Sequence, residues 1–231
     1  MARVRELSDY VRIDGRNLWS RNAVKGTSVR GERLKRDGRK EWRQWNPRAS
    51  KLGAGLLRAT EDVAGLLPPI GSTCLYLGAG HGTTISHLHD HLCGSNNHHQ
   101  GTIVAVDLSS RCIRDIIRLA ESRPGIFPVL ADVRDCNSVT PFLSHKTPWI
   151  FQDVSQTSQV EIFINICDKF LSPKGTAILS LKAASERQIE GGISAQFEHA
   201  ESIIQASGYR LIERINLAGW EDKHVLFQIR K

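Results

Sequence analysis

The 231-residue sequence lacks the patterns that mark membrane, secreted and metal-clamped proteins. No apolar run approaches the roughly 18 residues that a helix needs to span a bilayer, and the N-terminal residues include no apolar stretch typical of a signal peptide. The five cysteines form no Cys-x-x-Cys pair and are odd in number, which argues against a disulfide framework and a zinc site. We therefore expect a cytoplasmic protein with reduced cysteines, no metal and no membrane partner.

Acidic residues are scarce in the first fifth of the chain. The whole sequence has 31 Lys and Arg against 24 Asp and Glu, a formal net charge of +7. Residues 1–51 hold 15 basic and 6 acidic residues, which leaves 16 basic and 18 acidic residues for the rest of the chain. The basic segment also contains Trp19, Trp42 and Trp45. Basic residues interleaved with aromatic ones favour contact with a nucleic acid, and a solvated basic surface is the alternative.

Short runs of alternating apolar and charged residues fill the basic segment. Turn dipeptides such as Asp14-Gly15 and Asp37-Gly38 separate them, which is the pattern of a small antiparallel β-structure. After Asn46-Pro47 the apolar residues recur at helical spacing, which predicts a helix leading into Pro68-Pro69. The two predicted domains are a basic β-rich module over residues 1–47 and a larger domain over residues 48–231.

From Ser72 onward, strand-like segments alternate with segments of helical spacing. Several early strand candidates are continuous apolar runs, as expected for parallel strands covered on both faces. The link between the last two strand candidates is too short for a helical crossover, so these two should pair antiparallel at the sheet edge. This order predicts an α/β fold with the seven-stranded Rossmann-like sheet of class I methyltransferases, which use S-adenosylmethionine. The predicted strands are 73–77, 102–107, 126–131, 148–153, 176–182, 209–217 and 223–230, and the predicted helices are 83–93, 109–121, 135–145, 156–170 and 193–207.

Three glycines, Gly78, Gly80 and Gly82, follow the first of these strands. Such a turn lets a ligand approach bare backbone, and the helix that follows offers unpaired N–H groups. A dinucleotide pattern, Gly-x-Gly-x-x-Gly, would need a glycine at position 83, where Thr83 stands. The turn also lacks a group of basic residues that would neutralise a pyrophosphate. It therefore favours a cofactor with an adenosine and no phosphate over NAD.

Polar side chains stand at the carboxyl ends of successive predicted strands, where ligands bind in open α/β sheets. Asp107 is placed to accept hydrogen bonds from a ribose diol, and Asp132 to accept one from an adenine amino group beside an apolar wall. Asp153 and Lys182 end the next two strands. Each acid alone is more often a turn former or helix cap, but the set together favours S-adenosylmethionine. The residues expected to contact this cofactor are Gly78, Ala79, Gly80, Gly82, Thr83, Thr84, Asp107, Leu108, Asp132, Val133, Asp153 and Gln156.

The sequence resembles the fibrillarin family, and specifically its archaeal fibrillarin-like RNA 2′-O-methyltransferases. The segments that carry the resemblance are Trp45–Leu52, Leu75–Thr84, Gln152–Gln156 and His224–Phe227. The similarity covers nearly the whole chain, and the absence of a glycine-rich arm favours the archaeal form. Two departures are Gly80-His81, where the family usually has Ala-Ser, and a polar insertion over residues 94–101.

The resemblance implies a Lys-Asp-Lys-His active-site group, which falls on Lys51, Asp153, Lys182 and His224. The main task in methylating a ribose 2′-hydroxyl is to hold its oxygen in line with the methyl–sulfur bond. Lys182 and Asp153 would orient the hydroxyl and guide away its proton. A neighbouring carboxylate favours a protonated amine, so orientation is the favoured role of Lys182 and base action the lesser one. Lys51 would bind the flanking RNA phosphate. A surface lysine, a turn former and an edge-strand histidine are the ordinary alternatives for these residue types.

The resemblance also implies partners. The enzyme would transfer methyl groups from S-adenosylmethionine to rRNA and tRNA riboses and take part in the processing of these RNAs. A box C/D guide RNA would select the target within a ribonucleoprotein that contains a Nop5-type scaffold protein and L7Ae. The alternative is a non-catalytic RNA-binding or assembly subunit that keeps the fold, although such a subunit need not hold all four active-site residues.

Other chemistries lack their residues. Cytosine C5 methylation needs a nucleophilic cysteine beside a strand end, but Cys167 is expected in mid-helix and Cys136 follows the wrong strand. Methylation of exocyclic amines typically uses Asp/Asn-Pro-Pro-aromatic, where this chain has Asp153-Val-Ser-Gln156. His87 and His91 share a helix face at i, i+4, but no carboxylate-rich or cysteine partner completes a metal site. A solvated helix end is the favoured interpretation of these histidines.

Overall fold

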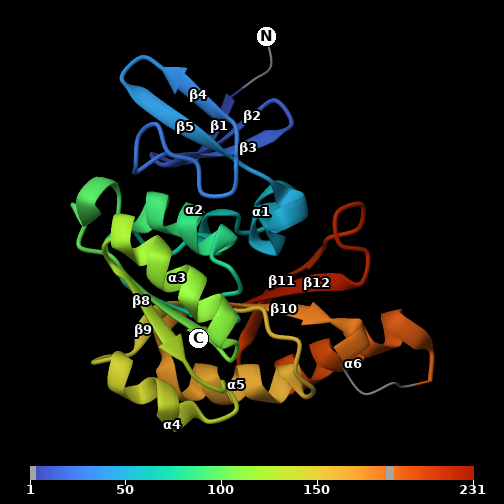
Figure 1. Ribbon diagram of the computed structural model, residues 1–231. Coiled ribbons are helices and arrows are strands. Elements are labelled where there is room, and N and C mark those ends of the chain that lie inside the picture. The colour runs from blue at the N-terminus through green and yellow to red at the C-terminus, as the bar shows by residue number, and fades with distance from the viewer. Residues whose placement is uncertain (1–3, 186–189) are drawn as a thin grey trace.

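Two separate β-sheets organise the chain (Figure 1). The computed structural model describes residues 4–185 and 190–231. The N-terminal sheet has the order β1-β2-β3-β5-β4, and every neighbouring pair in it is antiparallel. Its strands are β1 (Val4–Ser8), β2 (Val11–Asp14), β3 (Asn17–Arg21), β4 (Leu34–Asp37) and β5 (Lys40–Trp45).

The second sheet has seven strands in the order β11-β12-β10-β9-β6-β7-β8. Strands β10, β9, β6, β7 and β8 pair in parallel, whereas β12 runs antiparallel between β10 and β11. This is the predicted sheet, including the antiparallel pair at its edge. The strands are β6 (Thr73–Leu77), β7 (Thr102–Asp107), β8 (Ile126–Leu130), β9 (Thr147–Gln152), β10 (Leu171–Lys182), β11 (Arg210–Asn216) and β12 (His224–Arg230).

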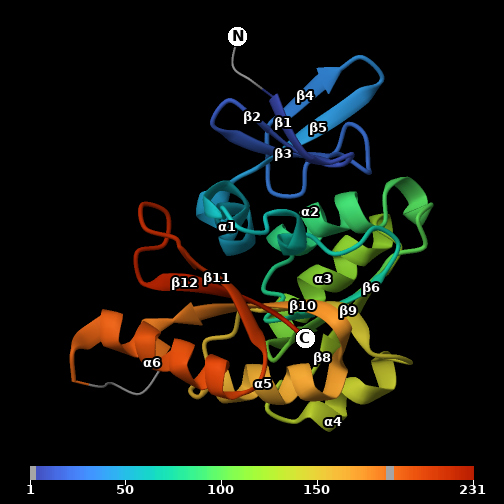
Figure 2. The ribbon, with the colours of Figure 1, turned by 180° about the vertical axis from the view of Figure 1, so that it is seen from behind.

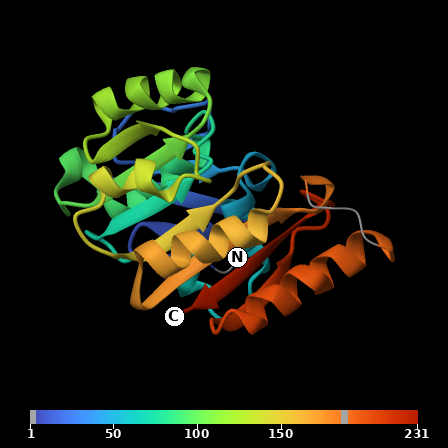
Figure 3. The same cartoon turned by 90° about the horizontal axis from the view of Figure 1, so that it is seen from below.

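Helices cover both faces of this sheet (Figures 1 and 2). Because side chains alternate along a strand, Cys74 and Tyr76 pack on one face and Leu75 and Leu77 on the other, and all four are buried. Seen from below, α5 and α6 lie side by side across the second face (Figure 3). In the described ranges, no helix has the length and apolar content needed to cross a membrane. The helices are α1 (Lys51–Arg58), α2 (Thr83–Leu92), α3 (Ser110–Ser122), α4 (Cys136–Val139), α5 (Gln159–Phe170) and α6 (Gly192–Ala206).

Three helices are shorter than their sequence patterns predict. The helix expected to run to Pro68 ends at Arg58, because the carboxylate of Glu213 accepts hydrogen bonds from the next backbone N–H groups and draws the chain away. Helix α4 covers one turn and gives way to a 3₁₀ turn that contains Pro141, which cannot donate an intrahelical bond. Helix α5 begins at Gln159 rather than 156, because Ser158 has a left-handed backbone.

The N-terminal sheet packs against α2 through a buried carboxylate. Asp90 of α2 accepts hydrogen bonds from Arg43 of β5 at 2.8 Å, from the Ser20 hydroxyl at 2.8 Å and from Arg123. Asp90, Arg43 and Arg123 are at most 1% exposed. Burial alone raises the pKa of Asp90, but the charges of the two arginines outweigh it and hold this pKa well below its usual range. The carboxylate is therefore ionised in the folded protein and joins three parts of the chain.

The histidines of α2 are part of the same interface, which corrects their interpretation as a solvated helix end. His87, His89 and His91 are all buried. His87 stacks on Trp45 with ring centroids 4.8 Å apart, and the other two bond the carbonyls of Pro124 and Pro68. Among the residues that the structure describes, no group of three or more His, Cys, Asp or Glu could hold a metal ion.

The three N-terminal tryptophans belong to the core rather than to a base-stacking surface. Trp19, Trp42 and Trp45 are at most 3% exposed, and the Arg12 guanidinium lies 4.0 Å above the Trp42 ring. An aromatic surface for stacking RNA bases is therefore absent at these positions. Trp45 also belongs to one apolar cluster that includes residues of the N-terminal sheet, of α1 and α2, and of the seven-stranded sheet. The division into two domains at residue 47 stays a prediction.

We expect Asp90→Asn to lower the free energy of unfolding by about 3–5 kcal/mol, because it leaves the buried Arg123 without its ion-pair partner and the buried Arg43 with Glu32 alone. Urea denaturation of the full chain measures this loss. The control is Glu201→Gln, which removes an exposed ion pair to Arg214 and should cost under about 1 kcal/mol. Equal losses in the two variants would show that the buried pair does not anchor the module.

We also expect acid to destabilise the protein below pH 6.5. Burial lowers the pKa of His89 and of His91 to about 4, so between pH 6.5 and 4 the unfolded chain binds protons that the folded chain excludes. Stability should fall with decreasing pH in this window by up to about 1.4 kcal/mol per pH unit for each histidine. His91→Gln retains a donor for the Pro68 carbonyl but does not titrate, so its stability should fall less steeply. Denaturation series from pH 8 to 4 provide the slopes, and identical slopes would contradict this assignment.

Candidate active site

The glycine turn holds the ends of two strands together. The N–H groups of Gly78 and Ala79 both bond the carbonyl of Val106. Gly78 has a φ of +80°, and a Cβ at this position would lie 2.1 Å from the carbonyl oxygen of Asp153. Only glycine therefore allows β6 and β9 to end this close together. Gly80, in contrast, has a φ of +55° and no heavy atom within 4 Å of the Cβ position, so its side faces open space.

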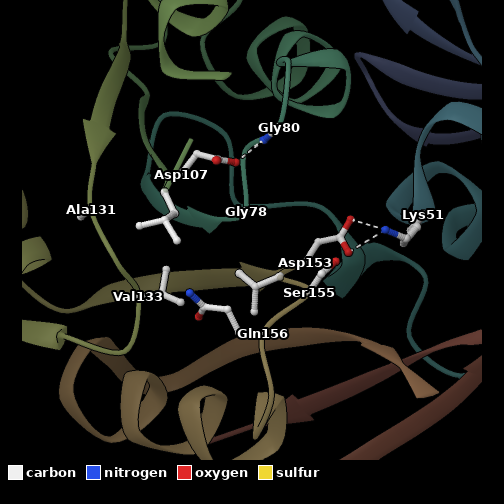
Figure 4. A pocket seen from close by; sticks show the side chains of 11 residues that line it. Lys51, Gly78, Gly80, Asp107, Ala131, Val133, Asp153, Ser155 and Gln156 are labelled. Atoms are coloured by element: carbon white, nitrogen blue, oxygen red, sulfur yellow. Dashed lines mark hydrogen bonds and ion pairs between the residues drawn. The ribbon is translucent and has the colours of Figure 1, made fainter. Parts of the chain in front are cut away.

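A cavity of about 450 Å³ lies at the carboxyl ends of β6, β7, β8 and β9 (Figure 4). This volume is in the range of small-molecule sites. Its position is the one that the strand-end argument predicts. The lining residues are Lys51, Gly78, Gly80, Asp107, Leu108, Ala131, Val133, Asp153, Val154, Ser155 and Gln156.

Asp107 is held at the rim of the cavity by backbone amides. Its carboxylate accepts a hydrogen bond from the N–H of Gly80 at 2.8 Å and one from the N–H of Ser109, also at 2.8 Å. Both bonds fix the side chain at the end of β7, and Figure 4 shows the one from Gly80. A carboxylate has about four acceptor sites, so further acceptor capacity remains for a ligand hydroxyl.

Asp132 does not line the cavity but bonds Gln156, a residue that does. Its carboxylate accepts hydrogen bonds from Arg134 and from the side-chain amide of Gln156, the latter at 3.1 Å. The bonds from Arg134 hold the pKa of Asp132 well below its usual range. The cavity is lined by the neighbouring Val133 and by Gln156 rather than by Asp132 itself. Contact between Asp132 and an adenine amino group stays a prediction.

Thr83 and Thr84, at the start of α2, do not line the cavity, and their contact with the methionine end of a cofactor stays a prediction. Thr84 is 8% exposed, and its hydroxyl hydrogen-bonds the Ser50 hydroxyl at 2.9 Å. Ser50 caps α1 by accepting the N–H of Gly53. The threonine therefore fixes the start of α1, whose first residue is Lys51. Of the other glycine-turn residues, Gly82 faces α3, and Ala79 is buried without lining the cavity.

Lys51 and Asp153 form an ion pair on one side of the cavity (Figure 4). The lysine Nζ lies 2.8 and 2.9 Å from the two carboxylate oxygens. The two side chains are 23% and 20% exposed, so the pair is accessible to a ligand. Asp153 is itself fixed at the end of β9, because its N–H bonds the carbonyl of Leu77.

Lys182 and His224 complete the predicted group from neighbouring strands. They are register partners at the end of β10 and the start of β12. Burial and the charge of Lys51 lower the pKa of His224, while Asp153 and Lys182 also act on it electrostatically. This histidine is therefore neutral at pH 7. Lys51, Asp153 and Lys182, up to 173 positions away in the sequence, thus all lie near enough to His224 to act on its charge.

Sequence reasoning found most of this site but missed some residues. Ala131, Val154 and Ser155 line the cavity although they were not predicted to. Each directly adjoins a predicted residue at a strand end, and this adjacency is the signal that would have found them. His81 of the glycine turn points away from the cavity to bond the carboxylate of Asp115 at 2.7 Å, so its side chain leaves the lining unchanged.

Known proteins resemble the chain over its full length. The family model described as fibrillarin matches residues 8–231. A "Fibrillarin-like rRNA/tRNA 2'-O-methyltransferase" of Thermococcus onnurineus is 34% identical over 96% of this chain and 95% of its own. The crystal structure of Aeropyrum pernix fibrillarin with natively bound S-adenosyl-L-methionine has a TM-score of 0.81 at 27% identity, covering 99% of this chain and 100% of that one. A fibrillarin/Nop5p complex gives a TM-score of 0.82 at 27% identity, with 97% and 99% covered.

The match to the family model runs from the N-terminal sheet to the last strand. The chain belongs to the fibrillarin family.

Proposed function

We propose that this protein is an S-adenosylmethionine-dependent RNA 2′-O-methyltransferase. The observation that carries the proposal is the ion pair of Lys51 and Asp153 at the side of the strand-end cavity, with Lys182 and His224 at the next strand ends. The named activity of the Thermococcus relative supports it. The proposed cofactor is the one bound by the Aeropyrum protein.

The residues around the cavity fit S-adenosylmethionine. The lining contains two carboxylates, Asp107 and Asp153, and one cation, Lys51, which is already paired. This balance disfavours a pyrophosphate and suits a cofactor with a cationic sulfonium and ammonium group. Asp107 would accept hydrogen bonds from the ribose diol, and the apolar side chains of Leu108 and Val133 would flank the adenine. When bound, the cofactor supplies an electrophilic methyl group.

The active-site residues would hold the RNA hydroxyl and remove its proton. Asp153 lies at the end of β9, where its carboxylate can accept a hydrogen bond from the 2′-hydroxyl and draw off the proton as the oxygen attacks. Lys182, one strand away, would donate a hydrogen bond to the same oxygen and fix its direction. Orientation of this kind can supply several kcal/mol of the barrier reduction. Lys51 would exchange part of its contact with Asp153 for an RNA phosphate.

Exposed cations of the N-terminal module would provide a further contact with RNA. Lys25, Arg36, Arg39 and Lys40 line a hollow of about 360 Å³ beside the turn between β4 and β5. The acid in this hollow, Glu41, is 6% exposed and already accepts hydrogen bonds from backbone and side-chain amides. The hollow therefore presents a net positive surface, which suits a phosphodiester chain.

The proposed enzyme acts inside a guide ribonucleoprotein. A Nop5-type scaffold is proposed because a fibrillarin/Nop5p complex has the same fold over nearly the whole chain. A box C/D guide RNA, a target rRNA or tRNA, L7Ae and a role in processing these RNAs are parts of the same proposal, and a cytoplasmic location stays a prediction. A non-catalytic assembly subunit is the competing function, and the tests below separate the two.

We expect efficient methyl transfer only when the full chain is combined with scaffold protein, L7Ae and a matching guide RNA. Tritiated S-adenosylmethionine measures the transfer, and nucleoside mass spectrometry after digestion locates the methyl group on the ribose. A guide with a mismatched target sequence is the control and should abolish the signal at that nucleotide. A methyl group on a base, or assembly without any transfer, would overturn the proposed activity, and the second result would favour the non-catalytic subunit.

We expect Asp153→Asn to slow single-turnover transfer by at least about 100-fold, because the amide keeps the shape but cannot take the proton. Asp135→Asn is the matched control. Asp135 is exposed and caps α4, a role that asparagine fills equally well, so its rate should stay within about twofold of the wild type. Equal rates for both variants would remove Asp153 from the reaction.

A further inference from the structure

We propose that Gln159 is a positioning residue that sets Lys182 relative to Asp153, an inference that rests on the proposed function. Asp153 follows β9 and Lys182 ends β10, and these two parallel strands are neighbours in the sheet. Their paired register ends at Gln152 and Leu179. Lys182 therefore stands beyond the region where β9 supports β10.

The side chain of Gln159 bonds the backbone of Lys182, which β9 no longer reaches. Its amide oxygen accepts the backbone N–H of Lys182 at 3.3 Å, and its amide nitrogen donates to the Lys182 carbonyl at 3.2 Å. A primary amide offers the same donor and acceptor as a peptide group. Gln159 thus takes the place of a β9 residue at the last residue of β10, three positions beyond the last β9 pair at Leu179.

The geometry of β10 makes this contact necessary. In an antiparallel pair, a residue either exchanges both backbone bonds with its partner or points both away from it. Both backbone groups of Lys182 bond Gln159, so they point away from β12 and from His224, its register partner there. Without the glutamine these two groups would lose their partners, which costs free energy where water is restricted. Strand β12 resumes its support only at the next residue, Ala183, whose N–H bonds the Lys223 carbonyl.

A second glutamine connects the Gln159–Lys182 contact, which we call the glutamine clamp, to Asp153. The side-chain amide of Gln152 donates to the backbone carbonyl of Gln159 at 2.8 Å, and both glutamines are fully buried. Gln152 directly precedes Asp153 in the chain. Gln159 therefore links the residue before the proposed proton acceptor, through its own backbone carbonyl, to the backbone of the proposed hydroxyl-orienting lysine, through its side chain. Neutral amides perform this task without placing another charge beside the ion pair.

The chain offers a matched control in Gln228. It is fully buried, lies on β12 and donates a hydrogen bond of 3.1 Å from its amide to the carbonyl of Asp62. Gln228→Leu and Gln159→Leu thus remove the same chemical group from equally buried positions. They differ in the partners that are lost, which are both backbone groups of Lys182 for Gln159 and the carbonyl and carboxylate of Asp62 for Gln228.

The test compares these variants by amide hydrogen exchange and by single-turnover methyl transfer. In the full chain, Gln159→Leu should raise the exchange rate of the Lys182 amide at least tenfold, whereas Gln228→Leu should leave it within twofold. In the reconstituted complex, Gln159→Leu should slow transfer by about 10- to 100-fold, in line with a displacement near 1 Å, and change the dissociation constant of S-adenosylmethionine by less than threefold. Unchanged exchange at Lys182, or equal loss of rate in both leucine variants, would overturn the proposal.

Gln159→Glu provides a second variant that retains the shape. Its carboxylate can accept the Lys182 N–H but cannot donate to the carbonyl until it is protonated, and burial favours the protonated form. Its rate relative to the wild type should therefore rise as the pH falls from 8 to 6, and a constant ratio would count against the clamp. If the wild-type complex transfers no methyl to ribose, the proposed function fails, while the exchange measurement still decides whether Gln159 holds Lys182.

Discussion

A carboxylate with no access to water, Asp90, determines how the two sheets meet. A buried charge is tolerated only when opposite charges and hydrogen bonds surround it, and here the partners come from β5 and from the residue after α3. The N-terminal module cannot shift along α2 without breaking this arrangement. Its last strand leads directly to the Ser50 cap, which Thr84 of α2 also holds. Helix α2 thus holds both β5 and Ser50, and so fixes the segment from β5 to Ser50 that places Lys51 beside Asp153.

The sequence could predict the site as far as topology determines it. Parallel strands bring their carboxyl ends to one edge, so Asp107 and Asp153 were placed beside the glycine turn by order alone, and both line the cavity. The direction of a side chain is a different matter. Thr84 is next to the turn in sequence, yet its hydroxyl bonds Ser50, 34 residues earlier. Such a partner depends on tertiary packing and leaves no local pattern.

The charge of the N-terminal module shows a similar limit. The sequence shows that arginine and lysine are in excess in this segment, but some of these residues are buried. Arg43 is fully buried against Asp90, and Arg12 covers an indole. Four of the exposed cations line the hollow beside the β4–β5 turn. Net charge counts buried and exposed basic residues equally, so it overstates the positive charge on the surface that a polyanion could contact. The tryptophans were misinterpreted for the same reason, since composition does not distinguish a core aromatic from a stacking platform.

The apolar cluster that contains Trp45 also decides how the chain comes apart. Val11 and Leu18 of the N-terminal sheet belong to the same buried cluster as Ile85 of α2 and Tyr76 of β6. If the small sheet melted first, it would leave apolar surface of the large domain facing water, at roughly 25 cal/mol for each Å² exposed. Unfolding of either sheet alone would therefore expose this shared cluster, and we expect the two sheets to unfold together. The boundary between the two sheets is therefore not expected to separate two transitions in thermal unfolding.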